Sequence, residues 1–175
     1  PAPTPMIETY DAMAKGVVDG SFTAGESVKN FRFAEVADYV LNTWIVGPVY
    51  PFYVAINKKK YNSLPPDLRS ILDELAGQYR ERMALVWNAE DFKGKEFGLE
   101  HGMEYRDLSD EQMKKWVKAV QPCIDNYIQA MVSSGYPEKE VKGWISWLRE
   151  RSGYYTEKQL DLRITSATGP PSMRP

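Results

Sequence analysis

The longest regular pattern of apolar residues in the chain runs from Ser63 to about Glu100. Within it, apolar residues recur every three or four positions, which is the spacing of one helical face: Leu68, Ile71, Leu72, Leu75, Tyr79, Met83, Val86 and Trp87. Pro65 and Pro66 fit the first helical turn, where the N–H that proline lacks would have no partner. We predict one helix, or two nearly collinear pieces, bent if anywhere near Gly77 or Gly94.

The predicted helix is long for a chain of 175 residues, a length that allows one domain or one domain and part of another. At about 1.5 Å per residue it extends over roughly 50 Å. A compact domain of this size is narrower than that. The helix must therefore bridge two bodies, or pack along one body and project from it.

Shorter patterns precede the long helix. We predict a helix over Met6–Gly16, a brief strand over Val17–Gly20, a helix from Glu26 to about Tyr39 and a loop over Trp44–Val49. Phe52–Ile56 is apolar at every position, which is typical of a strand covered on both faces.

After the long helix, His101-Gly102 is a stop signal and Met103–Leu108 alternates like a strand. Ser109 to Gln112 matches a capping box, which starts another amphipathic helix that Pro122 is expected to kink. A last amphipathic helix follows the break at residues 135–137. The polar tail from Gly153 contains an alternating stretch, which leaves an edge strand and a loose tail both open: Leu160, Leu162 and Ile164.

Composition excludes several classes of protein. The net charge is −2, and the one cationic run, Lys58–Lys60, is expected to be a solvated surface turn, so nothing indicates nucleic-acid binding. No run of about 18 apolar residues is long enough to span a membrane. The sequence also shows no signal-peptide pattern. The single Cys123 excludes an internal disulfide.

Candidate catalytic and metal-binding chemistry is sparse. The only histidine, His101, stands at a helix end without cysteines or carboxylates at metal-ligand spacing. Cys123 lies on a helix face with no second histidine to activate it. The sequence also lacks a phosphate-binding glycine loop. We therefore predict no catalytic residue, no metal and no cofactor, and we expect that the protein is not an enzyme.

Three sequence blocks resemble one known family. Pro3-Thr4-Pro5-Met6, followed by Glu8, Tyr10, Ala12, Gly16 and Val18-Asp19-Gly20, resembles P-x-P-M…E-x-Y-x-A-L-x-x-G-x-V-D-G. The second block, Phe33-Ala34-Glu35-Val36-Ala37-Asp38-Tyr39, is similar to F-x-E-V-x-K-Y. The third, Ile56-Asn57-Lys58-Lys59-Lys60-Tyr61-Asn62-Ser63-Leu64-Pro65-Pro66-Asp67-Leu68, is similar to I-N-K-K-x-[WY]-x-S-L-P-P-D-L. All three patterns are typical, in this order, of the solute-binding proteins of tripartite ATP-independent periplasmic (TRAP) transporters.

The resemblance implies an α/β, periplasmic-binding-protein-like fold of two lobes, of which this sequence is a partial, helix-rich C-terminal portion. It divides the sequence into four parts: 1–62 as part of the second ligand-binding lobe, 63–100 as a long inter-lobe helix, 101–152 as a closing strand and helices, and 153–175 as a C-terminal tail. It also implies a longer precursor with a secretory signal, and a periplasmic location.

The resemblance implies a ligand site as well. Many family members read Q-E-N-P after Val-Asp-Gly, with the asparagine on the ligand. Thr23 takes that position here and Phe22 replaces an acid beside it. These departures favour an apolar or aromatic carboxylate over sialic-acid-like or C4-dicarboxylate ligands. Trp44 and Tyr50 are further candidates for the same cleft, with core packing as the alternative.

The family's carboxylate-binding arginine is expected in an N-terminal half that this sequence lacks, so these 175 residues alone are expected to bind organic acids weakly. The implied function is capture of a small organic acid and its delivery to the TRAP membrane permease, without chemistry. A second hypothesis is a protein-interaction or dimerisation module built on the long helix, because uncovered apolar faces and sheet edges bind other proteins.

Overall fold

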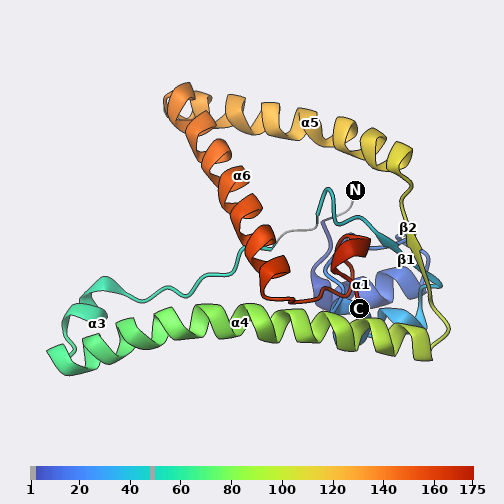
Figure 1. Cartoon of the computed structure of the whole chain (residues 1–175), viewed down its shortest axis with the longest axis horizontal. Helices are drawn as coiled ribbons and strands as arrows, with labels where there is room; N and C mark the ends of the chain where they lie inside the picture. Colours follow the sequence, from blue (N-terminus) through green and yellow to red (C-terminus); the bar gives the residue numbers. More distant parts are fainter. Residues whose placement is uncertain (1–2, 48–49) are drawn as a thin grey trace. The chain divides into compact units, whose positions relative to one another are not determined.

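A computed structural model describes residues 3–47 and 50–175 of the protein. It divides the protein into two compact units, each made of two stretches of sequence. The first contains the described residues of 1–38 and 48–103, and the second contains residues 39–47 and 104–175. Within these described ranges, the fold is helix-rich with one small sheet (Figure 1).

The first unit is built on helix α4, Pro66–Glu100, whose 35 residues are continuous through Gly77 and Gly94. Pro66 takes the first helical position, and Asp67 places a negative charge in the first turn. The helix stops before Gly102, whose φ of +81° favours glycine. The prediction of one long helix is confirmed, with its start three residues later than Ser63.

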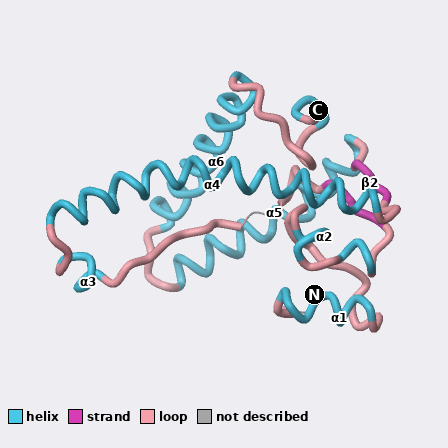
Figure 2. The backbone as a smooth tube through the Cα atoms, turned by 90° about the horizontal axis from the view of Figure 1, so that it is seen from below, coloured by secondary structure: helices cyan, strands magenta, loops and turns pink. Residues whose placement is uncertain are grey.

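The described residues of the first unit also form three shorter helices and a 3₁₀ turn: α1 Met6–Ala14, α2 Ser27–Asn30, η1 Phe33–Glu35 and α3 Lys58–Asn62 (Figure 2). Helix α2 packs on the C-terminal part of α4, where Gly94 and Gly98 are buried. The core beside them is formed by buried side chains of α2, η1 and the end of the unit: Val28, Phe33, Ala34 and Met103.

Two predictions for the N-terminal stretch of the first unit are wrong. Val17–Gly20 forms no strand, because the N–H groups of Val17 and Val18 both turn back to donate to the carbonyl oxygen of Ala12. The helix predicted over Glu26–Tyr39 ends at Asn30. Arg32 has a φ of +58°, in the left-handed region, which interrupts a right-handed helix.

The strand predicted over Phe52–Ile56 is also wrong. Tyr53 and Val54 are 88% and 95% exposed, and the only β-ladder within the described ranges joins other residues. A strand needs a neighbour for its backbone groups, and the apolar run alone does not provide one. Phe52 packs on Trp87 of α4 instead, with 4.4 Å between ring centroids.

The cationic run Lys58–Lys60 is a helix, not a turn. Asn57 caps α3, because its side-chain oxygen accepts from the backbone N–H groups of Lys59 and Lys60, at 3.0 and 3.3 Å. All three lysines are exposed, so the expectation that the run is solvated is confirmed.

The apolar stripe of α4 between Leu68 and Val86 is largely exposed. Six of its residues have exposed fractions between 40% and 61%: Leu68, Ile71, Leu72, Leu75, Tyr79 and Val86. Among the described residues, α4 therefore buries its C-terminal part against α2 and leaves much of the predicted apolar face uncovered.

The second unit contains a parallel pair of strands, β1 Tyr39–Asn42 and β2 Glu104–Asp107, in a register that pairs Asn42 with Asp107. Strand β2 confirms the predicted strand at Met103–Leu108. Strand β1 begins where the sequence pattern predicted the end of a helix.

Two long helices follow the sheet: α5 Asp110–Ser133 and α6 Glu138–Asp161. The predicted capping box is confirmed, because the Gln112 side-chain oxygen accepts from the Ser109 N–H at 2.8 Å while the Ser109 hydroxyl accepts from the Gln112 N–H at 3.3 Å. Helix α5 continues through Pro122. Helix α6 includes Leu160, so the edge strand considered for the tail does not form.

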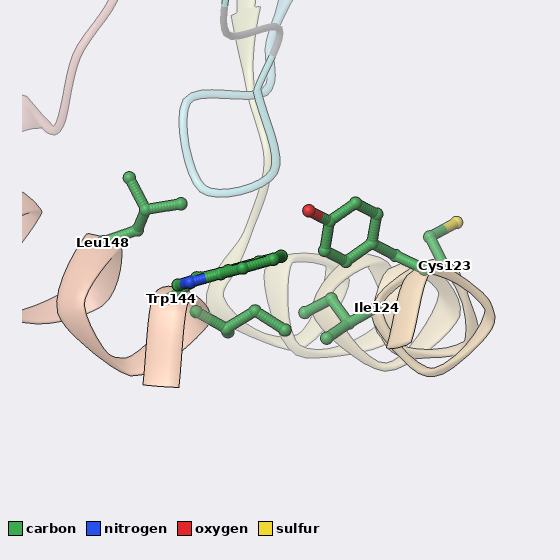
Figure 3. A pocket seen from close by; sticks show the side chains of 6 residues that line it. Cys123, Ile124, Trp144 and Leu148 are labelled. Carbon is green, nitrogen blue, oxygen red and sulfur yellow. The ribbon is translucent and has the colours of Figure 1, made fainter. Parts of the chain in front are cut away.

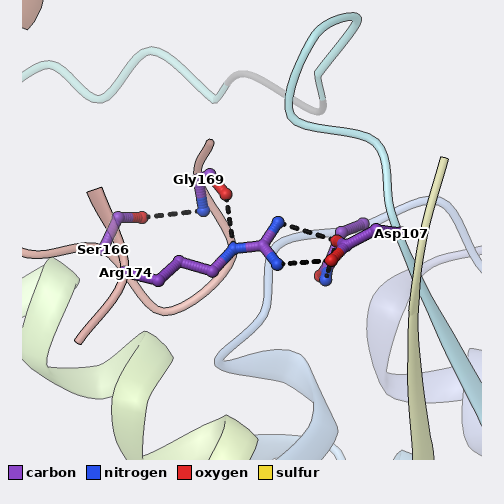
Figure 4. Close-up of polar contacts among 5 residues, drawn as sticks. Asp107, Ser166, Gly169 and Arg174 are labelled. Carbon is purple, nitrogen blue, oxygen red and sulfur yellow. Dashed lines mark hydrogen bonds and ion pairs between the residues drawn. The ribbon is translucent and has the colours of Figure 1, made fainter. Parts of the chain in front are cut away.

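The C-terminal residues up to Arg174 are held in place by a cluster of polar contacts (Figure 4). The Arg174 guanidinium donates two hydrogen bonds of 2.7 Å to the Asp107 carboxylate and one of 2.6 Å to the Gly169 carbonyl oxygen. The Asn42 amide donates to the same carboxylate at 2.8 Å. Met173 is buried beside them. The loose tail, the other alternative left open for these residues, does not form either.

Candidate functional site

Three of the four candidate ligand residues lie in the first unit. Phe22 and Thr23 belong to the segment before α2, and Tyr50 belongs to the segment before α3. The Tyr50 hydroxyl donates to the Phe22 carbonyl oxygen at 3.2 Å, which joins the two segments. Phe22 is 57% exposed and Tyr50 46% exposed, so both rings present apolar surface to solvent.

A series of side-chain hydrogen bonds connects Thr23 to the interior. Its hydroxyl lies 2.9 Å from the Ser27 hydroxyl, which in turn donates to Glu26 Oε1 at 3.3 Å. Ser27 is 1% exposed and Glu26 is 8% exposed. Thr23 is therefore the half-buried outer end of a polar series whose inner end is a carboxylate.

Asp91 of α4 brings a second carboxylate to this region. Its Oδ1 accepts from the backbone N–H of Glu26 at 2.9 Å. Burial raises the pKa of Asp91, the hydrogen bond from Glu26 lowers it, and the negative charge of Glu26 raises it further, so that the net direction is upward. The interior behind Thr23 is thus acidic.

Trp44, the fourth candidate, belongs to the second unit. It stands in the turn after β1, in which the Thr43 hydroxyl donates to the Gly47 carbonyl oxygen at 2.9 Å. The described part of the predicted loop, residues 44–47, is confirmed as a turn; Pro48 and Val49 lie outside the described residues. Trp44 lines a hollow of about 350 Å³ together with residues of α6 and the C-terminal segment: Ile45, Ser152, Thr156, Gln159, Ser166, Gly169, Pro170 and Met173.

A separate apolar groove of about 280 Å³ lies between α5 and α6 (Figure 3). The groove is lined by side chains of both helices: Cys123, Ile124, Tyr127, Trp144, Ile145 and Leu148. The Cys123 thiol is exposed there. The lining residues are mostly apolar, so this groove offers mainly packing surface.

Metal-binding chemistry is not gathered anywhere within residues 3–47 and 50–175, where no three His, Cys, Asp or Glu side chains lie close enough to hold an ion. His101 caps the end of α4, with Nδ1 2.8 Å from the Phe97 carbonyl oxygen and its ring 4.0 Å from the Phe97 ring, between centroids. Its role in this structure is to cap and pack against the helix.

Sequence reasoning missed Glu26, Ser27 and Asp91. Glu26 lies at the start of a predicted helix and Asp91 lies 65 residues later, so no spacing rule links them. Only the packing of α2 on α4 brings the two carboxylates together.

Comparison with known proteins places these residues in context. A family model described as bacterial extracellular solute-binding protein, family 7, matches residues 1–130. The protein is 28% identical over 124 residues to the C4-dicarboxylate-binding periplasmic protein DctP of Vibrio cholerae, a match over 69% of this chain and 36% of that protein. It is also 28% identical over 114 residues to a solute-binding protein of Albidiferax ferrireducens, with 64% and 33% of the two proteins matched.

Among solved structures, a TRAP periplasmic solute-binding protein from Desulfovibrio salexigens superposes with a TM-score of 0.70 at 27% identity. The match extends over 86% of this chain and 47% of that one. The 175 residues thus span about a third of the length of the curated relatives and about half of the solved one. No helix in the described ranges is both long and apolar enough to cross a membrane.

Proposed function

This chain belongs to the bacterial extracellular solute-binding proteins of family 7, the solute-binding proteins of TRAP transporters, and we propose that it captures a small organic carboxylate for delivery to a membrane permease. The observation that carries the proposal is the family match over residues 1–130, which includes the cluster of Phe22, Thr23 and Tyr50. Because the sequence spans only part of its relatives, the proposal concerns the full-length protein.

A carboxylate ligand is supported by two relatives. The Vibrio cholerae protein is named for C4-dicarboxylate binding. The Desulfovibrio salexigens structure is an open complex with the C-terminus of a symmetry mate in its ligand-binding site. Every polypeptide ends in an α-carboxylate, so that occupant has the chemical group that we propose for the ligand here.

We propose Phe22, Thr23 and Tyr50 as ligand contacts in the first unit. The two exposed rings supply apolar surface, and Thr23 supplies one polar atom. A site with this composition fits a carboxylate whose remaining skeleton is apolar or aromatic, because pockets combine apolar lining with a few placed polar groups. In the second unit, taken by itself, we propose Trp44 as a ligand-contact candidate, because it lines a hollow of about 350 Å³.

The division of the protein into a lobe segment up to residue 62, an inter-lobe helix, a closing segment to residue 152 and a tail is likewise proposed, from the family's architecture. The same membership supports a periplasmic location, as in the relatives named for it.

The proposal is tested by titrating aliphatic and aromatic carboxylates into the full-length protein by calorimetry. Matched neutral amides of the same skeletons are the controls. We expect micromolar or tighter binding of at least one carboxylate and no binding of its amide. Equal affinity for acid and amide would contradict recognition of a carboxylate.

A second function, self-association through α4, is favoured by the exposed stripe from Leu68 to Val86. Contiguous apolar surface of this kind typically binds another protein surface. Sedimentation equilibrium of the full-length protein tests it, with Leu75→Glu as the disrupting variant. A monomer at all concentrations would exclude a second copy on this face.

A further inference from the structure

The direction of the hydrogen bonds around Thr23 follows from counting hydrogens. The Ser27 hydroxyl contacts both Glu26 Oε1, at 3.3 Å, and the Thr23 hydroxyl, at 2.9 Å. A carboxylate only accepts, and a serine hydroxyl has a single hydrogen. Ser27 therefore gives its hydrogen to Glu26, and in the second contact Thr23 must be the donor.

The single hydrogen of the Tyr50 hydroxyl is also used in a hydrogen bond within the protein. Its hydroxyl donates to the Phe22 carbonyl oxygen, and a carbonyl oxygen also only accepts. The hydrogens of Thr23 and Tyr50 are thus both used inside the first unit. What each hydroxyl oxygen can still offer to a ligand is its lone pairs.

The negative charge on the inner side of these hydroxyls also favours a ligand group that donates a hydrogen bond. Glu26 and Asp91 are joined by a backbone hydrogen bond on the inner side of the polar series that ends at Thr23. Glu26 is buried, and its Oε2 has no hydrogen-bond partner among the described residues. A negative interior favours a donor or a cation at Thr23, and it opposes a second carboxylate there.

We infer that the ligand carries, besides its carboxylate, a hydroxyl or amino group that donates a hydrogen bond to the Thr23 hydroxyl oxygen. This inference rests on the proposed function and names its ligand class: a hydroxy acid or an amino acid. The ligand's carboxylate points away from the Thr23 and Tyr50 hydroxyls, because its oxygens and the two hydroxyl oxygens would otherwise face each other as hydrogen-bond acceptors. Phe22, more than half exposed beside them, packs against the carbon skeleton.

Two series of probes test the inference in the full-length protein by calorimetry. One series is succinate, malate and aspartate, and the other is 3-phenylpropionate, 3-phenyllactate and phenylalanine. Within each series the skeleton is kept and the donor changes from none to hydroxyl to ammonium. We expect the preferred donor-bearing member to bind about threefold to tenfold tighter than the member without a donor, which is the net value of one ordinary hydrogen bond.

Three variants identify the acceptor. Thr23→Val removes the hydroxyl at nearly constant shape, and we expect the preference within a series to vanish. Ser27→Ala leaves the Thr23 hydroxyl but frees its hydrogen, so that Thr23 can also donate; the preference should shrink without vanishing. Thr4→Val is the matched control for hydroxyl loss in the same unit, and it should keep the preference. Thermal melting verifies that each variant is folded.

The outcomes separate this inference from the proposed function. Equal binding within both series, or a preference that Thr23→Val leaves unchanged, overturns the inference while carboxylate capture stands. Tighter binding of the member without a donor overturns it as well. Failure of all six compounds to bind, with the protein folded, counts against both proposals.

Discussion

Gly94 of α4 lies directly against the backbone of Gly25: a Cβ on Gly94 would stand 2.9 Å from the Glu26 Cα and closer still to the Gly25 carbonyl oxygen. This contact lets α4 approach the segment that carries Thr23 and Glu26. A glycine that weakens an isolated helix is therefore what allows the two segments to pack.

We expect Gly94→Ala to lower the free energy of unfolding. Forcing a methyl group into a packed contact typically costs about 1–3 kcal/mol, and this exceeds the roughly 1 kcal/mol by which alanine favours a helix. Gly77→Ala, in the same helix, is the matched control, because a Cβ there meets nothing within 4 Å. It should stabilise by roughly 0.5–1 kcal/mol. Urea unfolding of both variants measures the difference, and destabilisation by Gly77→Ala alone would contradict the packing described here.

Asp91→Asn is expected to stabilise the protein at neutral pH. Burial, the largest influence, raises the pKa of Asp91 above its ordinary 3.8, so the folded state keeps this proton to a higher pH than the unfolded state. The free energy of unfolding therefore falls as pH rises between the two pKa values, and it stays lower above them. The asparagine Oδ1 can still accept from the Glu26 N–H.

The measurement is urea unfolding of wild type and Asp91→Asn at pH 7 and at about pH 3, below the ordinary carboxylate pKa. The stabilisation should be present at pH 7 and small at pH 3. Asp19→Asn, an exposed site in the same unit, controls for the loss of one negative charge. If Asp91→Asn raises the free energy of unfolding equally at both pH values, desolvation of the Asp91 carboxylate is not the cause of the stabilisation.

Arg174 and Asp107 are expected to be energetically coupled. Their contact is bidentate, and the Arg174 side chain is only 14% exposed. We expect Arg174→Gln to lower the free energy of unfolding by about 1–3 kcal/mol, as for hydrogen bonds to charged groups with some solvent screening. Arg149→Gln, an exposed arginine of α6, should change it by at most about 0.5 kcal/mol.

A double-mutant cycle with Asp107→Asn isolates the pair. Residues in direct contact typically show coupling of about 0.5–3 kcal/mol. Additive effects of the two substitutions would mean that the C-terminal segment is held by burial of Met173 and not by this ion pair.

Much of the helical fold was predictable from the sequence. Helices α4 and α5 both show a sustained three-and-four spacing of apolar residues. Each also has a local start signal, Pro66 for α4 and the Ser109 capping box for α5. Spacing and start signals can both be recognised without knowing any distant residue. Strands depend on partners. Phe52–Ile56 has a strand-like composition without a strand beside it, whereas β1 exists because β2, more than 60 residues later, pairs with it.

The candidate site also contains residues that the sequence predicted and residues that it did not. The family pattern identified Phe22 and Thr23 as candidates, and Tyr50 was added from its place beside the predicted loop; the structure joins Phe22 to Tyr50 by a hydrogen bond. Their contact with a ligand stays a prediction. The acidic interior behind Thr23 was not predictable, because it depends on Asp91 reaching the Glu26 backbone across the α2–α4 contact.

The central claim is that a small organic carboxylate binds against Phe22, Thr23 and Tyr50. The most direct test is a crystal structure of the full-length protein with its tightest-binding carboxylate. We predict ligand atoms within about 4 Å of the Phe22 ring, and a ligand hydroxyl or amino group within hydrogen-bond distance of the Thr23 hydroxyl. A well-ordered ligand bound elsewhere, with none of these three residues in contact, would contradict it.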